Sequence, residues 1–194
     1  LNTTRIFNPT TWSWAAGPAM FRGRHSHSAN LLRDGRVVVV GGSDGNQEIS
    51  LAEVYDPAAN TWTRITANPI FGNDLDIPRL GHTATLLPDG KLMFVGGFTA
   101  LGGPIKQAEG FDVDFSTFQM QGLTGDARGD HATVLLRDGF LLTAGGFNGL
   151  SYSGLSEVLY AGAFPDVRTL AGGLRRRPLI TRMVPTLVGV GSQI

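Results

Sequence analysis

A segment of nineteen residues occurs three times in this chain of 194 residues, and the three copies align without gaps. The copies begin at Arg24, Arg79 and Arg128. The histidines they share, His27, His82 and His131, are 55 and 49 residues apart. A fixed period of this length indicates a repeat architecture, in which each copy forms one small structural unit and packs against its neighbours.

Each copy contains two short apolar runs joined by Asp-Gly, as at Asp34-Gly35. That dipeptide between apolar runs predicts a two-residue hairpin turn with positive φ at both positions. The second run is almost continuously apolar and ends at a Gly pair; the three runs are Val37 to Val40, Leu92 to Val95 and Phe140 to Leu142. A strand of this kind is expected to be covered on both faces by neighbouring sheets.

Aromatic residues mark the outer half of each repeat. A third strand is expected to end at Tyr55, Phe111 or Leu159, and Trp62 or Phe118 marks a fourth. The N-terminal stretch carries the same half motif, with Phe7 and Trp14 at the same spacing as Tyr55 and Trp62. In the third copy no Trp follows Leu159-Tyr160, so the pattern does not define its fourth strand near 163–170.

The order Arg, His, strand, Gly-Gly, Glu-x-aromatic-Asp and Trp resembles the kelch repeat over roughly residues 5 to 160. The resemblance implies an all-β fold, a β-propeller of four-stranded blades forming a single domain over 1–194. The expected blades are 24–78, 79–127 and 128–181, with 1–23 as the outer strands of a preceding blade and 182–194 as the inner strand of a following one. We expect a piece of a larger ring or, alternatively, a four-bladed closure of the two ends.

Composition limits the classes of partner. Sixteen Lys and Arg balance sixteen Asp and Glu, so no net charge favours nucleic acid, and no apolar run reaches the roughly 20 residues of a membrane span. The chain has no cysteine, which excludes disulfides, thiolate nucleophiles and Cys-based zinc sites. Composition assigns no compartment, but the phrases LLPDGKLMFVGG and VYDPAANTW resemble kelch repeats of secreted bacterial proteins, which favours an extracellular or cell-surface location.

Topology predicts where a ligand would bind. In a blade of four alternating strands, the connection between the second and third strands lies on the same face as the connections between blades. In this chain, those connections are long and variable in sequence. Because binding residues concentrate in loops on a rigid scaffold, we expect the binding site there. The candidate residues are Asp44, Asn46, Asn73, Asp74, Asp76, Arg79, Asp126, Arg128, Asn148 and Tyr152.

The repeated charges allow two interpretations. The arginines that open each copy and the later Glu53, Glu109 and Glu157 are expected to pair with each other or with the backbone, because an unpaired buried charge is costly. Alternatively, the arginines form a rim around the central channel and bind an anionic ligand. The histidines are expected to serve packing or hydrogen bonding within their own blades, and we predict no metal site.

The chain contains no HExxH, GxSxG, phosphate-loop or dinucleotide motif, which favours a protein that is not an enzyme and needs no cofactor. The main interpretation is a non-catalytic binding or scaffold module that binds a protein or a carbohydrate, with self-association through open blade edges as a further contact. The alternative is a fragment of a sugar-directed kelch enzyme, mutarotase-like, epimerase-like or oxidase-like. Galactose oxidase-like copper chemistry needs a tyrosine cross-linked to a cysteine, which this chain lacks.

Overall fold

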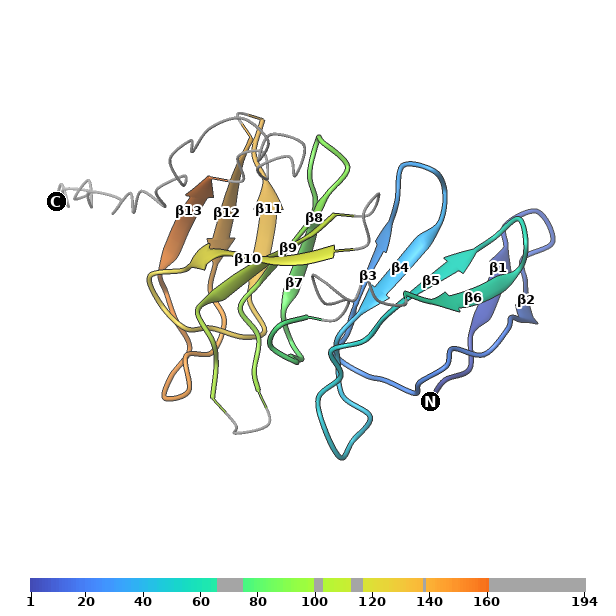
Figure 1. Ribbon diagram of the computed structural model, residues 1–194, viewed down its shortest axis with the longest axis horizontal. Coiled ribbons are helices and arrows are strands. Elements are labelled where there is room, and N and C mark those ends of the chain that lie inside the picture. Colours follow the sequence, from blue (N-terminus) through green and yellow to red (C-terminus); the bar gives the residue numbers. More distant parts are fainter. Residues whose placement is uncertain (66–74, 100–102, 113–116, 138, 161–194) are drawn as a thin grey trace, which may run out of the picture.

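The computed structural model describes residues 1–65, 75–99, 103–112, 117–137 and 139–160. The regular elements in these ranges are β-strands arranged in four antiparallel sheets (Figure 1). Three sheets stand side by side, and a hairpin lies at the N-terminal end of the row. The described part of the chain contains no helix long and apolar enough to cross a bilayer.

Strand order within each sheet follows the sequence. The N-terminal hairpin pairs β1 (Arg5–Asn8) with β2 (Ser13–Ala16). Blade 1 contains β3 (Ser28–Leu31), β4 (Val37–Val40), β5 (Ala52–Asp56) and β6 (Thr61–Arg64). Blade 2 contains β7 (Thr83–Leu86), β8 (Leu92–Val95), β9 (Gln107–Asp112) and β10 (Thr117–Leu123). Blade 3 contains β11 (Ala132–Leu135), β12 (Phe140–Ala144) and β13 (Ser156–Tyr160).

This architecture confirms the predicted all-β fold of propeller-like blades. Both halves of the repeat form strands at the predicted positions, including the N-terminal half motif, which forms β1 and β2. The predicted strands near 163–170 and in 182–194 lie outside the described residues.

The Asp-Gly turns differ from the prediction. In the first two turns only the glycine has a positive φ, 90° at Gly35 and 91° at Gly90, whereas Asp34 keeps a negative φ. The Leu32 N–H donates to the Arg36 carbonyl at 2.8 Å, and the Gly35 N–H donates to the Leu32 carbonyl at 3.1 Å. The loop therefore has three residues, a type I turn closed by a left-handed glycine. Because Asp34 Oδ1 accepts the Arg36 N–H at 3.0 Å, the carboxylate stabilises this longer turn, and the predicted two-residue turn is wrong.

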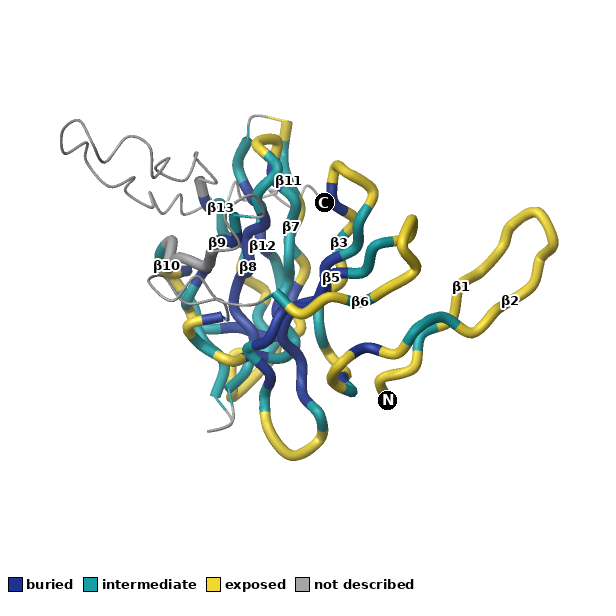
Figure 2. The backbone as a smooth tube through the Cα atoms, turned by 45° about the vertical axis from the view of Figure 1, so that its right-hand side comes forward, coloured by how far each residue is buried: buried dark blue, intermediate teal, exposed yellow. Residues whose placement is uncertain are grey.

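The core lies between the blades. Leu92 and Phe94 of β8 are buried against blade 1, while Met93 and Val95 are buried against blade 3. Successive side chains of a strand point to opposite faces, so a strand between two sheets must be apolar at every position. Each fully buried side chain of this size contributes about 1.5–3 kcal/mol of transfer free energy. The predicted coverage of both faces is confirmed for β8, and Figure 2 shows the buried strands at the centre of the row.

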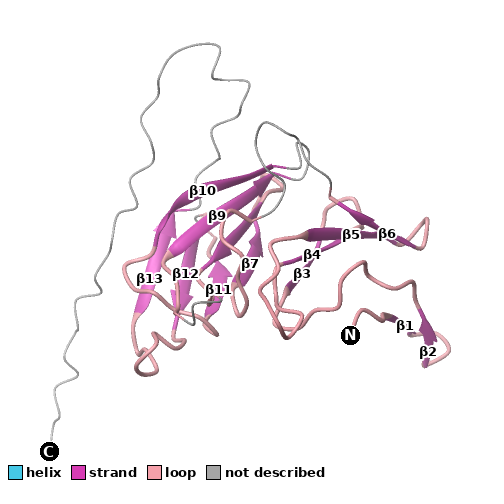
Figure 3. Cartoon of the chain, turned by 60° about the horizontal axis from the view of Figure 1, so that its bottom comes forward, coloured by secondary structure: helices cyan, strands magenta, loops and turns pink. Residues whose placement is uncertain are grey.

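The third blade shows the consequence of covering one face only. In β12 the buried residues alternate with half-buried ones, Leu141 and Thr143 being buried. Among the described residues, no sheet packs against the other face of this blade (Figure 3). The continuous apolar run of the sequence therefore becomes an alternating pattern of burial in this blade.

The candidate binding face and the clamps beneath it

The long connections β4–β5, β8–β9 and β12–β13 lie on one side of the row, at the bottom of Figure 1, and the short Asp-Gly turns lie on the opposite side. The connections that enter each blade lie on the side of the long connections, as the topology argument predicted. We call this side the loop face.

The recurring arginines and glutamates form a buried clamp under each long loop. In blade 2, Arg79 Nη2 binds Glu109 Oε1, and Nη1 donates to the carbonyl oxygens of Gly96 at 2.9 Å and Gln107 at 2.8 Å. Gly96 and Gln107 stand at the two ends of the β8–β9 connection, so the clamp closes the base of the loop. The same bonds recur at Arg24 with Glu53 and at Arg128 with Glu157.

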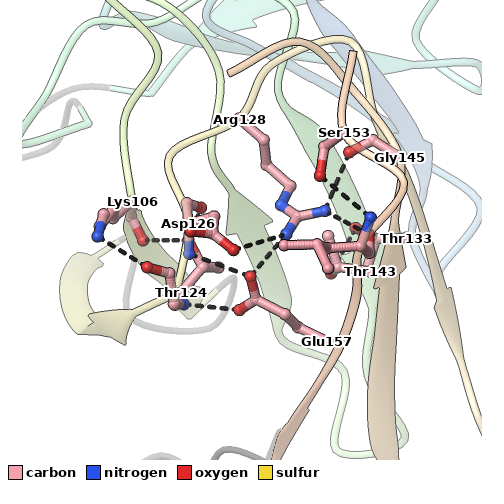
Figure 4. A network of polar contacts seen from close by, with 11 residues as sticks. Lys106, Thr124, Asp126, Arg128, Thr133, Thr143, Gly145, Ser153 and Glu157 are labelled. Carbon is pink, nitrogen blue, oxygen red and sulfur yellow. Dashed lines mark hydrogen bonds and ion pairs between the residues drawn. The ribbon is translucent and has the colours of Figure 1, made fainter. Parts of the chain in front are cut away.

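Each glutamate also holds the connection that enters its blade. Figure 4 shows blade 3, where Glu157 accepts the backbone N–H of Gly125 at 2.6 Å and of Asp126 at 3.0 Å. The equivalent donors are Asp76 to Glu109, and Phe21 and Arg22 to Glu53. One clamp therefore fixes two loops of the loop face at once.

The clamps confirm the predicted pairing of the repeated charges. The side chains of Arg79 and Glu109 are both fully buried. Burial raises the pKa of the Glu109 carboxyl, and the Arg79 guanidinium opposes that rise. The guanidinium and the Asp76 N–H together satisfy the carboxylate oxygens. These arginines support the loops from below and do not form a rim open to a ligand.

The repeated histidines link neighbouring blades. His82 Nε2 lies 2.9 Å from Ser28 Oγ of blade 1, and His131 Nε2 lies 3.0 Å from Thr83 Oγ1 of blade 2. His82 also packs edge-to-face against Phe94 of its own blade at 5.7 Å, so the expected packing within the blade is confirmed there. The expected hydrogen bonding within the blade is wrong, because each of these two rings reaches a hydroxyl of the preceding blade. Burial, with Arg79 as the next cause, lowers the pKa of His82 to about 3; burial, then Arg128, lowers that of His131 to about 4. Both rings are neutral at physiological pH.

Two of the predicted site residues, Asp44 and Asn46, lie at the tip of the β4–β5 loop. Asp44 Oδ1 accepts the backbone N–H groups of Asn46 at 2.9 Å and Gln47 at 3.0 Å, and Oδ2 binds Arg22 at 2.8 Å. These bonds lower the pKa of Asp44 to about 2, the backbone hydrogen bonds being the largest cause. The carboxylate is thus used to shape its own loop.

Asn148 plays the same part in the β12–β13 loop. Its Oδ1 accepts the backbone N–H groups of Leu150 at 3.0 Å and Ser151 at 2.8 Å. Tyr152 follows on the same loop with 87% of its surface exposed, and it makes no described hydrogen bond through its hydroxyl. Within the described ranges, Tyr152 is the predicted candidate whose side chain is most available to a ligand.

The remaining candidates belong to the connections between blades. Asp76 and Asp126 donate backbone N–H groups to the clamps, and Asp126 Oδ2 lies 3.9 Å from Arg128. Arg79 and Arg128 are the clamps themselves. Asn73 and Asp74 lie outside the described residues. No described contact joins the candidates of blade 1 to those of blade 3.

Two phenylalanines on the loop face were not among the predicted site residues. Phe98 and Phe147 directly follow the Gly pairs of blades 2 and 3, with ring centroids 6.5 Å apart. The ring of Tyr152 packs edge-to-face on Phe147 at 5.6 Å, and Leu150 beside it is 94% exposed. We call these four residues the aromatic patch. The sequence does contain a feature that could have predicted this patch. In blades 2 and 3 a Phe directly follows the Gly pair, whereas blade 1 has Ser43 at that position.

The described loop face presents side chains suited to contact with a ligand. The described residues contain no group of three or more His, Asp or Glu side chains arranged to hold a metal ion. The carboxylates of Asp44 and of the three clamp glutamates are already bound to backbone N–H groups and to arginine. The face also offers a ligand the aromatic patch and loop backbone.

Comparisons with known proteins identify the repeat. A family model described as the Kelch motif matches residues 24–69, which contain blade 1 and its clamp of Arg24 and Glu53. Residues 24–69 form a kelch repeat. The chain resembles an F-box/kelch-repeat protein of Arabidopsis thaliana, with 26% identity over 105 residues, which is 50% of this chain and 21% of that protein.

Two other relatives carry kelch repeats in different settings. A galactose oxidase of Gibberella zeae is 35% identical over 75 residues, 37% of this chain and 11% of the enzyme. Kelch-like protein 35 of Mus musculus is 30% identical over 93 residues, 47% of this chain and 14% of that protein. The chain thus spans between about a tenth and a fifth of these relatives. They come from a plant, a fungus and a mouse, so they do not support the predicted bacterial and secreted character.

Proposed function

We propose that this kelch-repeat chain is a non-catalytic binding module that binds a protein through its loop face. Kelch repeats generally form protein-binding modules, and the relatives include F-box/kelch-repeat and kelch-like proteins. The observation that carries the proposal is the aromatic patch, in which Leu150 and Tyr152 are almost fully exposed on loops with clamped bases.

Fixed loops favour binding for a physical reason. Ordering a loop on association consumes part of the interaction free energy, and a loop already held in place avoids that loss. Exposed aromatic side chains provide large contact area at a low entropic cost, which is why tyrosine is common in binding hot spots. Arg128 and Glu157 hold the loop that carries Tyr152, so this part of the face combines both properties.

Selection of a displayed peptide library against the purified chain tests the proposal. We expect selected peptides to contain apolar residues, and we expect Leu150→Ser with Tyr152→Ser to raise their dissociation constants by about tenfold or more. The matched control is Leu31→Ser, because Leu31 is also an exposed leucine, 64% exposed, but lies on β3 away from the loop face. Equal losses in both variants, or selection of sugars and not peptides on a parallel glycan array, would contradict protein binding at this patch.

A further inference from the structure

The turn between β1 and β2 presents a tryptophan to solvent. Trp12 is 81% exposed at the tip of the hairpin, on the opposite side of the molecule from the loop face. Figure 2 shows the hairpin projecting from the row of blades with exposed residues along its length. The ring is not isolated, since Trp14 on the same hairpin is 61% exposed and Phe7 is 37% exposed, and neighbouring exposed apolar side chains of this kind mark interaction sites.

The repeat supplies an internal control for this position. Asn60 occupies the equivalent place in the β5–β6 turn of blade 1, and it too is exposed. Exposure is therefore a property of the turn tip and does not depend on which strands lie beside the hairpin. The two residues also share a left-handed backbone, with φ of 50° at Trp12 and 53° at Asn60.

That backbone conformation suits asparagine and not tryptophan. Asparagine is enriched at positive φ, whereas a bulky residue there is a steric outlier. Asn60 also uses its amide, since its Oδ1 accepts a hydrogen bond from the Tyr55 hydroxyl at 2.9 Å. Trp12 gives up this bond and accepts the backbone strain, and strain retained at an exposed position points to function.

Neighbouring rings hold the indole in place. The ring of Phe7 meets Trp12 edge-to-face, with centroids 5.8 Å apart and planes 79° apart, and also contacts Trp14 at 5.1 Å. An edge-to-face contact uses the rim of one ring and leaves the opposite side of the indole open. The exposed indole is thus oriented before any ligand arrives.

The turn segment that carries Trp12 is otherwise polar and uncharged. Residues 8–13 read Asn-Pro-Thr-Thr-Trp-Ser, with no acidic or basic side chain. Asn8 Oδ1 is engaged by the N–H of Thr10 at 2.9 Å, and the hydroxyls of Thr11 and Ser13 lie 2.8 Å apart next to the indole in sequence. A ligand that matches this set has an apolar face, hydroxyl groups at its edge and no charge.

We propose that Trp12 and the hydroxyls of this turn form a binding site for a neutral carbohydrate. The C–H groups on one face of a pyranose ring stack on the negative face of the indole, while its hydroxyls exchange hydrogen bonds with Thr11 and Ser13. Charge complementarity favours a neutral sugar over an anionic one. The site is separate from the loop face and does not depend on the function proposed there.

Calorimetric titration of the purified chain with cellohexaose, maltohexaose and β-1,4-galactohexaose tests the proposal. We expect at least one of them to bind, and we expect Trp12→Asn to raise its dissociation constant by about tenfold or more. Because asparagine is the residue at the equivalent turn, this variant should keep or raise the midpoint of thermal unfolding. Trp12→Phe should weaken binding less.

A reciprocal variant separates the role of the indole from that of the fold. Asn60→Trp, made in the Trp12→Asn background, places an indole in the same backbone conformation on blade 1, next to Thr61. Partial recovery of sugar binding supports the proposal. It is overturned if none of the three sugars binds at millimolar concentration, if Trp12→Asn leaves the dissociation constant unchanged, or if Trp12 mediates binding to phosphatidylcholine vesicles and not to sugars.

Discussion

At the scale of single residues, the stability of the loop face depends on charges that cannot reach water. Arg79 and Glu109 satisfy each other and four backbone groups in a fully buried clamp. Removing one partner leaves the other charge in a medium of low dielectric constant. Such a pair is therefore more sensitive to the loss of one member than its net contribution to stability suggests.

Glu109→Ala should lower the free energy of unfolding by about 3–5 kcal/mol, because it leaves the Arg79 guanidinium buried without its carboxylate. Urea denaturation followed by circular dichroism measures the change. The control is Arg36→Ala, which breaks an exposed pair with Asp34 at 2.7 Å and should cost about 1 kcal/mol or less. Similar small losses in both variants would show that the clamp is not a structural requirement.

The histidines between blades should make the fold sensitive to acid. The pKa of His82 is lowered to about 3 by burial, below the 6.5 of a free imidazole, so the unfolded chain takes up a proton before the folded chain does. The contribution of neutral His82 to the free energy of unfolding is therefore fully present above pH 6.5 and is lost as the pH falls toward 3. His82→Gln should flatten the decline of the urea midpoint between these two values. An unchanged slope would contradict a neutral, buried His82.

At the scale of elements, the Gly pairs set how closely the blades approach. The Gly97 N–H donates to the Arg128 carbonyl of the next blade at 2.8 Å, and a Cβ at Gly96 would overlap that same oxygen. Gly145 is the equivalent of Gly96 in blade 3 and shares its left-handed φ, 70° against 59°. A Cβ added at Gly145 would have the Ser153 carbonyl oxygen as its nearest described neighbour, 4.0 Å away.

This difference predicts unequal effects of one substitution at two equivalent sites. Gly145→Ala should destabilise by about 1–2 kcal/mol through its backbone conformation alone. Gly96→Ala should lower the free energy of unfolding by about 1–3 kcal/mol more than Gly145→Ala does, because the methyl group forces blades 2 and 3 apart. Thermal or urea unfolding compares the two, and equal losses would mean that contact between the blades does not depend on this glycine.

At the scale of the whole molecule, the row of blades has two open ends. Among the described strands, the two outer strands of each sheet, β1 and β13 included, have one edge without a partner, and strand edges of this kind pair readily with other chains. Leu31 on β3 and Val134 on β11 are 64% and 52% exposed. Open edges and exposed apolar side chains together favour contact between copies.

We therefore expect the isolated chain to self-associate. Light scattering should give a mass above the 20.6 kDa of one copy, rising with concentration. Val134→Lys should lower that mass, whereas Thr63→Lys, on the exposed outer strand β6, should leave it unchanged. A single species of monomer mass at all concentrations would contradict the expectation.

The sequence was sufficient for the strands because their signals are local. The run Val37 to Val40 and the aromatic spacing of Tyr55 and Trp62 each report on one strand and its neighbours, and both matched the structure. The turn at Asp34 was misjudged because two turn types use the same dipeptide and differ in backbone dihedrals.

The candidate site was predicted less well. The sequence located the loop face and the tip residues Asp44, Asn148 and Tyr152, but it could not separate side chains that shape a loop from those that face solvent. Phe98 and Phe147 were passed over because only their packing across two blades makes them one patch.

The repeat by itself determined that this chain forms antiparallel sheets of the kelch type, since periodic apolar residues, glycine pairs and aromatics fix local backbone and burial. Only the tertiary structure decided the partners of its buried polar groups. Arg79 meets Glu109 thirty residues later, and His82 reaches a hydroxyl on the preceding blade. Such contacts depend on how the sheets stack, and one repeat read alone does not contain that information.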